Sequence, residues 1–214
     1  MPVEVFGDPV CDIGGARSVL EGLCRPGCHP ERGLHSQPKR RRVFEQSNIY
    51  RQVRNFNVDI RQTMTKKTAA FHWQVAQATS MTNVYIYAST DPGATQMGPL
   101  TENGSGGFLS DVYISGGKYG ICADGGIQQY TVRHFEVHGQ TDSCIVLIWD
   151  WGWTWYGLYL DSAPNGFSLL NPEADGAART PTGSVYVMDS LFLNIKTGIK
   201  TNALKKEIKE STII

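Results

Sequence analysis

Residues 112–121 read Val-Tyr-Ile-Ser-Gly-Gly-Lys-Tyr-Gly-Ile, which is an apolar pair, a glycine turn and a second apolar anchor. Apolar residues that alternate with other types are typical of a β-strand with one buried face, and the Gly-Gly pair is typical of a turn. The arrangement returns at Phe135-Glu-Val137, which is followed by Cys144-Ile145. Each copy therefore supplies two short strands in the same order, and this repetition decides the fold class.

The apolar pair recurs along most of the chain. Its copies begin 28, 28, 23, 23 and 33 residues apart, at Phe56, Val84, Val112, Phe135, Leu158 and Leu191. The second anchor recurs as Gly120-Ile121, Cys144-Ile145, Gly166-Phe167 and Gly198-Ile199. A repeat of roughly 20 to 50 residues is typical of a solenoid, in which each unit buries its apolar face against its neighbours. We predict an all-β, right-handed parallel β-helix over residues 48–202. A leucine-rich repeat fits less well, because no helical period fills the spacers.

The two flanks differ from this repeat. Residues 1–47 hold three of the five cysteines and the run Lys39–Arg42 without a periodic apolar pattern, so we expect an irregular segment there. Cys24 and Cys28, with two histidines nearby, suggest a zinc site, but a second tight ligand pair is lacking and we expect no metal or other cofactor. The tail, residues 203–214, has room for a helical turn or two.

Charge and hydropathy exclude several classes of partner. The 214 residues carry 20 basic and 20 acidic side chains, so a zero net charge gives no reason to expect nucleic acid or an anionic membrane. No apolar run approaches the roughly 20 residues that span a bilayer. The first residues lack the basic and apolar regions of a secretory signal, so the sequence leaves the location of this product open.

Three motifs stand out within the repeats. They are Phe71-His-Trp-Gln-Val-Ala-Gln77, Glu102-Asn-Gly-Ser-Gly-Gly107 and Ile148-Trp-Asp-Trp-Gly-Trp-Thr-Trp155. In this order they resemble the fungal exo-β-1,3-glucanases of glycoside hydrolase family 55, in the pectate-lyase-like superfamily. The resemblance covers about residues 48–202 and implies an extracellular enzyme that hydrolyses laminarin-type β-1,3-glucan with inversion. Enzymes of this family pair two β-helical halves, and we expect only the first half in this chain.

The resemblance implies that Gln77 and Ser105 hold the water that attacks the anomeric carbon. Gln77 lies six residues after Phe71 and Ser105 lies five after Leu100, which predicts neighbouring positions on one edge of the solenoid. Both side chains are neutral, so their contribution would be orientation of the water. Glu102 is the nearest carboxylate and a weaker catalytic candidate. The alternative is that Gln77 and Ser105 are ordinary turn residues that satisfy backbone groups.

The tryptophan-rich motif suggests a surface for sugar rings. Four tryptophans share one parity and would face one side of an extended strand: Trp149, Trp151, Trp153 and Trp155. They are predicted substrate-binding residues, together with Trp73 and Asp150. The alternative is an aromatic stack inside the coils, and a break at Gly152 would leave only some rings exposed.

Inversion also needs a carboxylic acid that protonates the leaving oxygen, and the resemblance assigns that acid to the second half. We therefore expect a β-1,3-glucan-binding fragment that is inactive alone. The alternatives are a non-catalytic β-helical carbohydrate-binding protein and a pectin-directed enzyme. The second is disfavoured because paired Asp motifs are absent. Cys122 and Cys144 fall in adjacent repeats, which allows either a disulfide or two buried thiols.

Overall fold

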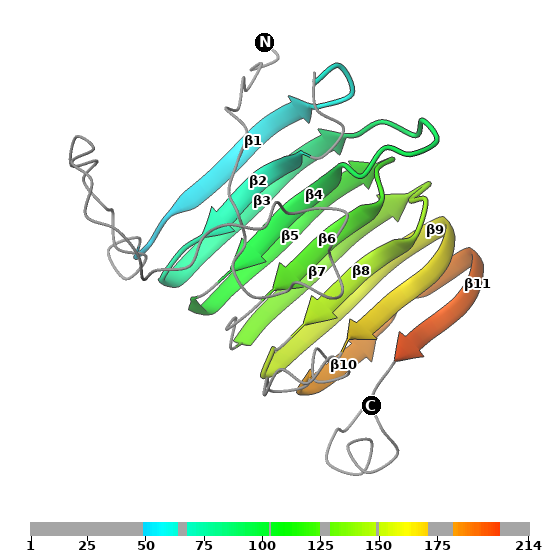
Figure 1. Ribbon diagram of the computed structural model, residues 1–214. Helices are drawn as coiled ribbons and strands as arrows, with labels where there is room; N and C mark the ends of the chain where they lie inside the picture. The colour runs from blue at the N-terminus through cyan, green and yellow to red at the C-terminus, as the bar shows by residue number, and fades with distance from the viewer. Residues whose placement is uncertain are drawn as a thin grey trace, which may run out of the picture.

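In the computed structural model every regular element of the described residues is a β-strand (Figure 1). The structure describes residues 49–63, 68–102, 104–124, 129–148, 150–170 and 182–201. No helix in these ranges is long and apolar enough to cross a membrane. The irregular segment predicted for residues 1–47, the tail 203–214 and the suggested zinc ligands lie outside the described residues.

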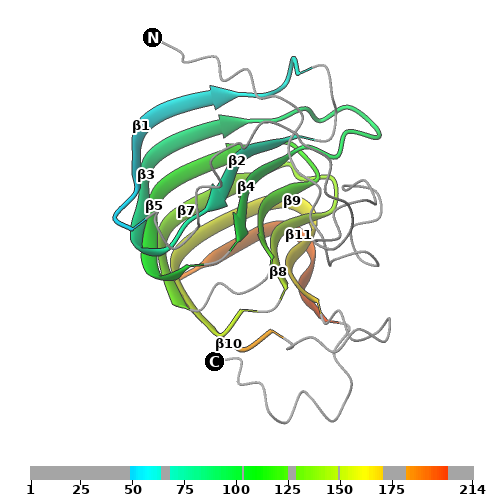
Figure 2. The ribbon, with the colours of Figure 1, turned by 60° about the vertical axis from the view of Figure 1, so that its left-hand side comes forward.

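Along the chain the strands alternate between two walls of a solenoid (Figure 2). Within each wall, strands of neighbouring coils pair in parallel. The first wall contains β1 (Gln52–Asp59), β3 (Gln77–Tyr87), β5 (Ser105–Ser115), β7 (Gln129–His138), the first part of β9 (Gly152–Leu170), and β10 (Ser184–Met188). The second wall contains β2 (Ala69–Gln74), β4 (Met97–Glu102), β6 (Tyr119–Asp124), β8 (Ser143–Ile148) and the second part of β9. β11 (Leu191–Thr201) pairs with β9 across both walls, so the strands join into one sheet that wraps around the core. This is the predicted parallel β-helix.

The strand register confirms five of the six predicted apolar anchors. Phe56 pairs with Val84, and the same column continues through Val112, Phe135 and Leu158. The sixth anchor was wrong by one residue, because Leu191 pairs with Tyr159, whereas Phe192 pairs with the buried Leu160. The last coil is therefore 32 residues after its predecessor.

A bend in the first wall is built from one residue per coil with a left-handed backbone. The residues at this bend are Asn55, Asn83, Asp111, His134, Gly157 and Asp189, with φ between 46° and 66°. Asn and Asp tolerate this conformation better than most residues. Two neighbouring pairs bond to each other: the Asn83 amide donates to the Asn55 oxygen at 2.8 Å, and His134 Nδ1 lies 3.2 Å from Asp111 Oδ1.

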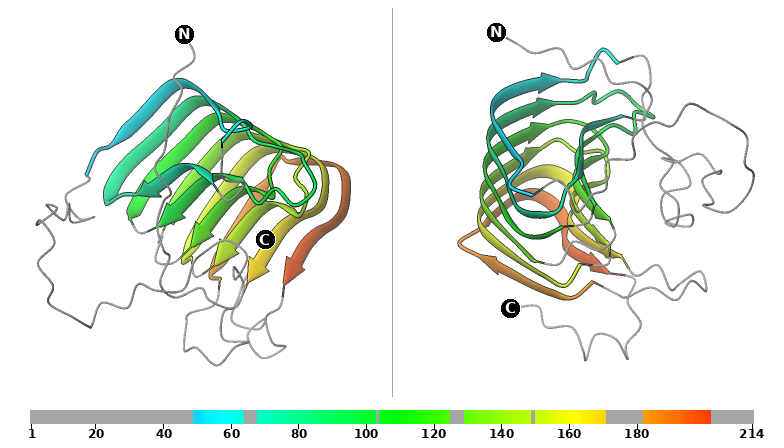
Figure 3. Two further views of the ribbon diagram at one scale, coloured as in Figure 1. Left: turned by 45° about the horizontal axis from the view of Figure 1, so that its top comes forward. Right: turned by 90° about the vertical axis from the view of Figure 1, so that its left-hand side faces the viewer.

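Apolar side chains from both walls fill the solenoid. The largest buried ones include Trp153, Trp155, Phe135 and Phe167, whose rings make edge-to-face and stacked contacts. The two views of Figure 3 show the strands wrapping around this interior from the first wall to the second.

The second wall is apolar on both faces. Ile121 and Ala123 face the main core, whereas Cys122 between them belongs to a second buried cluster with Leu100 and Val146. Cys144 lies in the main core, and Cys122 pairs in register with Val146. Cys122 and Cys144 form no disulfide and are two buried thiols, and burial raises the pKa of Cys144 to about 12.

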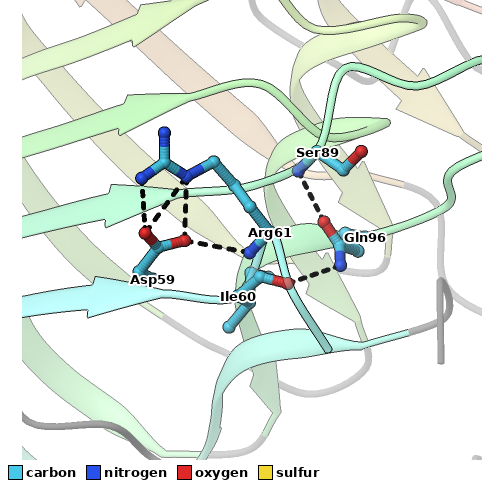
Figure 4. A network of polar contacts seen from close by, with 5 residues as sticks. All are labelled: Asp59, Ile60, Arg61, Ser89 and Gln96. Carbon is cyan, nitrogen blue, oxygen red and sulfur yellow. Dashed lines mark hydrogen bonds and ion pairs between the residues drawn. The ribbon is translucent and has the colours of Figure 1, made fainter. Parts of the chain in front are cut away.

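At the corner from the first wall to the second, a buried glutamine satisfies backbone groups of two coils (Figure 4). Gln96 is 1% exposed and its amide nitrogen donates to the Ile60 carbonyl at 2.7 Å. Its amide oxygen accepts from the Ser89 backbone N–H at 2.5 Å. Because unpaired backbone groups are costly inside a protein, Gln96 fixes the turns that follow β1 and β3.

Candidate functional site

The opposite corner, where the chain passes from the second wall to the first, contains the candidate site. Gln77 is the first residue of β3 and Ser105 is the first residue of β5, and the two are direct partners in parallel register. Adjacent strands lie about 4.8 Å apart, so the two side chains start one strand spacing from each other. Gln77 is exposed and Ser105 is half-buried. The expected neighbouring placement is present, although Phe71 pairs with Pro99 and not with Leu100.

Glycines shape this corner and do so for different reasons. A Cβ at Gly104 would lie 2.4 Å from the Ala76 carbonyl oxygen, and one at Gly107 would lie 2.8 Å from the Tyr130 ring. Gly106 has open space around it but a φ of 66°. Gly104 and Gly107 thus allow close packing inside the protein, and Gly104 and Gly106 both have the positive φ that favours glycine on either side of Ser105.

The carboxylate nearest to Ser105 in the sequence already has a partner. The Glu102 carboxylate contacts His72 Nε2, and the two side chains are only 12% and 19% exposed. Glu102 ends β4 and His72 lies in β2, on the neighbouring strand of the second wall. A charged or hydrogen-bonded His–Glu pair braces two adjacent coils beside the corner. His72 and Glu102 belong to two of the three sequence motifs, but the sequence alone does not reveal that their side chains meet.

Beneath the corner lies a buried column of aromatic rings. Tyr130 stacks on Trp153 at 5.0 Å between ring centroids, and Trp153 stacks on Trp155 at 5.1 Å. The Tyr130 hydroxyl and the Thr79 hydroxyl are 2.7 Å apart, and burial raises the pKa of Tyr130. The column therefore packs under the first residues of β3 and β5, and Gly107 leaves the room that the Tyr130 ring needs.

Three of the predicted substrate-binding tryptophans are buried, and two of them form the aromatic stack inside the coils that was the alternative. Trp153 and Trp155 do share a face, but they are 0% exposed because that parity points into the solenoid, and Trp73 is 6% exposed. Trp151 precedes the start of β9 at Gly152 and is 53% exposed, so it alone among these can contact a ligand directly. Trp149 lies outside the described residues.

Asp150 lies at the same corner, two coils after Ser105, but inside the protein. It is 1% exposed, and burial raises the pKa of its carboxyl group to about 7. The nearby Thr182 hydroxyl and Gly183 amide lower the pKa of Asp150 and so oppose this shift. The Thr182 hydroxyl donates to the Leu147 carbonyl, and the Gly183 N–H donates to the backbone carbonyl of Asp150. Neither carboxyl oxygen has a hydrogen-bond partner among the described residues. Direct contact with a sugar, as predicted for Asp150, does not fit this burial.

The described residues hold no cluster of three or more His, Cys, Asp or Glu side chains that could bind a metal ion. The corner is instead a polar edge with an amide, a hydroxyl and a His–Glu pair, and an exposed indole lies two coils away. Such groups can hold a water and sugar hydroxyls by hydrogen bonds.

Comparison with known proteins identifies the family. Residues 31–168 match the family model described as rhamnogalacturonase A/epimerase, pectate lyase-like. The chain belongs to this pectate-lyase-like family. The match covers more than half of the chain and includes both Gln77 and Ser105.

Individual relatives confirm the resemblance to the β-1,3-glucanases. The chain is 34% identical over 84% of its length to a glucan 1,3-beta-glucosidase of Cochliobolus carbonum, and covers 22% of that protein. It is 33% identical over 78% of its length to a probable glucan endo-1,3-beta-glucosidase of Arthroderma benhamiae, and covers 18% of it. A relative of another kind is the non-secreted LysM effector LysM15 of Penicillium expansum, 37% identical over 73% of this chain and 11% of that protein. The chain thus spans less than a quarter of the length of these curated relatives.

Proposed function

We propose that this chain is the water-positioning part of an inverting exo-β-1,3-glucanase that acts on laminarin-type glucan. The observation that carries the proposal is the direct pairing of Gln77 with Ser105 at an outward corner of the solenoid. Two relatives, named glucan 1,3-beta-glucosidase and probable glucan endo-1,3-beta-glucosidase, support a β-1,3-glucan as the substrate class.

In this proposal the two side chains fix one water in line with the scissile bond. The Gln77 amide oxygen accepts one water hydrogen, and the Ser105 hydroxyl donates to or accepts from the same water. This leaves a lone pair of the water directed at the anomeric carbon. Neither group is basic enough to remove a proton efficiently, so the rate gain comes from orientation, and the attacking water gives its proton to solvent as the new C–O bond forms.

The acid that protonates the leaving oxygen is proposed to come from a second β-helical half. Of the carboxylates described at this corner, Glu102 contacts His72 and Asp150 is buried, so neither is free to face a sugar from the opposite side. Inverting glycosidases place their two catalytic groups roughly 6.5 to 9.5 Å apart with the substrate between them.

The test is release of reducing sugar from laminarin. The 214-residue chain alone should release none above background, because general acid catalysis typically contributes about 10²- to 10⁴-fold and half of the cleft is absent. Fusion to the second half of a related glucanase should restore turnover. In that fusion Gln77→Ala and Ser105→Ala should each lower kcat by about 10²-fold with little change in KM.

Gln52→Ala is the matched control, because Gln52 is also the exposed first residue of a strand but pairs with Ser80. It should leave kcat unchanged. Turnover by the isolated chain, or equal loss in all three variants, would contradict the proposed roles.

A second candidate is a non-catalytic β-helical carbohydrate-binding protein. The 37% identity to a LysM effector, a relative whose name describes no glycosidase, favours it. Glucan binding by a fusion that has no turnover, and in which Gln77→Ala changes only affinity, would support this candidate over the first.

A further inference from the structure

The outer face of the first wall has an unusual composition beyond the left-handed bend. On four consecutive strands, β3, β5, β7 and β9, alternate residues point inward as the apolar core and the others point outward. The outward residues are Tyr85, Tyr87, Tyr113, Ser115, Glu136, His138, Tyr159 and Asp161. None of these eight is aliphatic. The last coil differs, since Leu191 and Leu193 register with Tyr159 and Asp161.

Five of these side chains form a continuous aromatic strip along the solenoid axis. The strip consists of Tyr85, Tyr87, Tyr113, His138 and Tyr159. Tyr113 is 6.1 Å from both Tyr85 and Tyr87 between ring centroids, and 5.0 Å from His138. His138 is in turn 5.2 Å from Tyr159, so the rings connect four coils without a break.

The strip is accessible and keeps free hydrogen-bonding groups. Tyr85 is 41% exposed, and its partner on β1 is Asn57, which is too small to cover the ring. The other rings are half-buried. Within the described part of the chain no tyrosine hydroxyl of the strip has a hydrogen-bond partner, so these hydroxyls are available to a ligand.

Carboxylates border the strip. Glu136 and Asp161 lie 3.6 and 3.9 Å from the ring nitrogens of His138. At the end of β1, Asp59 pairs with Arg61 (Figure 4). The Arg61 guanidinium lies over the Tyr87 ring, 5.5 Å from its centroid. Three carboxylates against one guanidinium disfavour a polyanionic ligand such as a uronic-acid polymer.

We propose that the aromatic strip binds a neutral polysaccharide. Aromatic rings offer flat apolar surface to the C–H groups of pyranose rings, while tyrosine hydroxyls and carboxylates bond to sugar hydroxyls.

The strip is separate from the corner that holds Gln77 and Ser105. Tyr85 follows Gln77 by eight residues on β3, which corresponds to about 25 Å of strand. The strip would hold an insoluble glucan while another surface acts on a chain end. Its existence does not depend on the proposed catalytic role of the corner.

Direct binding of the full 214-residue chain to insoluble β-1,3-glucan particles tests this inference. Tyr85→Ala and Tyr113→Leu should each weaken binding by about tenfold, since each removes one ring contact and the second keeps apolar volume on the strand. Tyr113→Phe should retain most of the binding. Polygalacturonate should not compete.

Tyr186→Ala is the matched control, because Tyr186 is 38% exposed on the first wall but lies outside the strip. Thermal unfolding of each variant shows whether it is folded. If Tyr85→Ala and Tyr113→Leu remain folded and bind as the unaltered chain does, or if the unaltered chain binds no glucan, the strip is not a polysaccharide site. Since Gln77→Ala leaves the strip intact, its failure to change turnover would not affect this result.

Discussion

At the scale of single residues, the buried carboxyl of Asp150 makes stability depend on pH. Its pKa is about 7 in the folded protein, against 3.8 for the unperturbed group. Between these values the folded state keeps the proton and the unfolded state has lost it. The free energy of unfolding should therefore fall as pH rises from about 4 to about 7, by at most about 4 kcal/mol from this group, and level off above.

Asp150→Asn should remove that slope and make the protein more stable than the unaltered chain at pH 8, since a neutral amide is cheaper to bury than a carboxylate. Urea unfolding between pH 4 and pH 8 measures both effects. Asp111→Asn, a change at an exposed carboxylate, should keep the slope. A slope that persists in Asp150→Asn would show that another group causes it.

The candidate site illustrates what single residues reveal in a sequence. The neighbouring placement of Gln77 and Ser105 was predicted from their similar offsets to Phe71 and Leu100, although the register in fact pairs Phe71 with Pro99. The shared face of Trp153 and Trp155 was predictable as well, but parity does not say which face is inside. In the structure Trp155 is in register with the buried Val132, and both indoles are themselves buried in the core.

At the scale of elements, glycines at the start of the second-wall strands set how closely the coils approach. A Cβ at Gly120 would lie 2.4 Å from the Cys144 carbonyl oxygen and 2.4 Å from a Val137 methyl group. Gly198 occupies the equivalent place in the last coil, and nothing lies within 4 Å of its Cβ position. The two glycines therefore have the same backbone role with different surroundings.

Gly120→Ala should lower the free energy of unfolding by about 1 to 3 kcal/mol, as expected for overpacking. Gly198→Ala, its matched control, should change the free energy of unfolding by less than about 1 kcal/mol. The expected change is an increase, because alanine leaves the unfolded chain fewer conformations than glycine does. Urea unfolding of both variants measures the difference. Equal destabilisation would mean that backbone conformation, and not the space between coils, selects glycine in this column.

The strand repeat shows where sequence reasoning about elements ends. Steps of 28 and 23 residues placed the first five anchors in the observed register. In the last coil both Leu191 and Phe192 can start an alternating apolar pattern, and a change of one residue exchanges the inner and outer faces. Pairing with β9 selects Phe192 for the inside and leaves Leu191 48% exposed.

At the scale of the whole molecule, the described solenoid exposes part of its inward apolar column at β11. Ile121, Ile145 and Phe167 occupy one inward column and are at most 1% exposed. Ile199 continues this column in β11 and is 41% exposed, because β11 pairs with β9 and with no other described strand. Solenoids depend on contacts between neighbouring repeats, so a last coil of this kind favours association through its open edge.

We therefore expect the purified chain to self-associate as its concentration rises, and Ile199→Lys to reduce this association. A lysine at the end of the inward column would place a charge on the surface that another chain must cover, and charged residues at sheet edges oppose edge-to-edge pairing. Because Ile199 is already part-exposed, the change should cost little stability.

Leu191→Lys is the matched control: it changes a residue of the same strand that is 48% exposed on the outer face and lies off the column. Sedimentation velocity over a range of concentrations distinguishes the two. If Ile199→Lys associates as strongly as Leu191→Lys, then contact between chains occurs elsewhere and the open end of the core is not the surface that drives it.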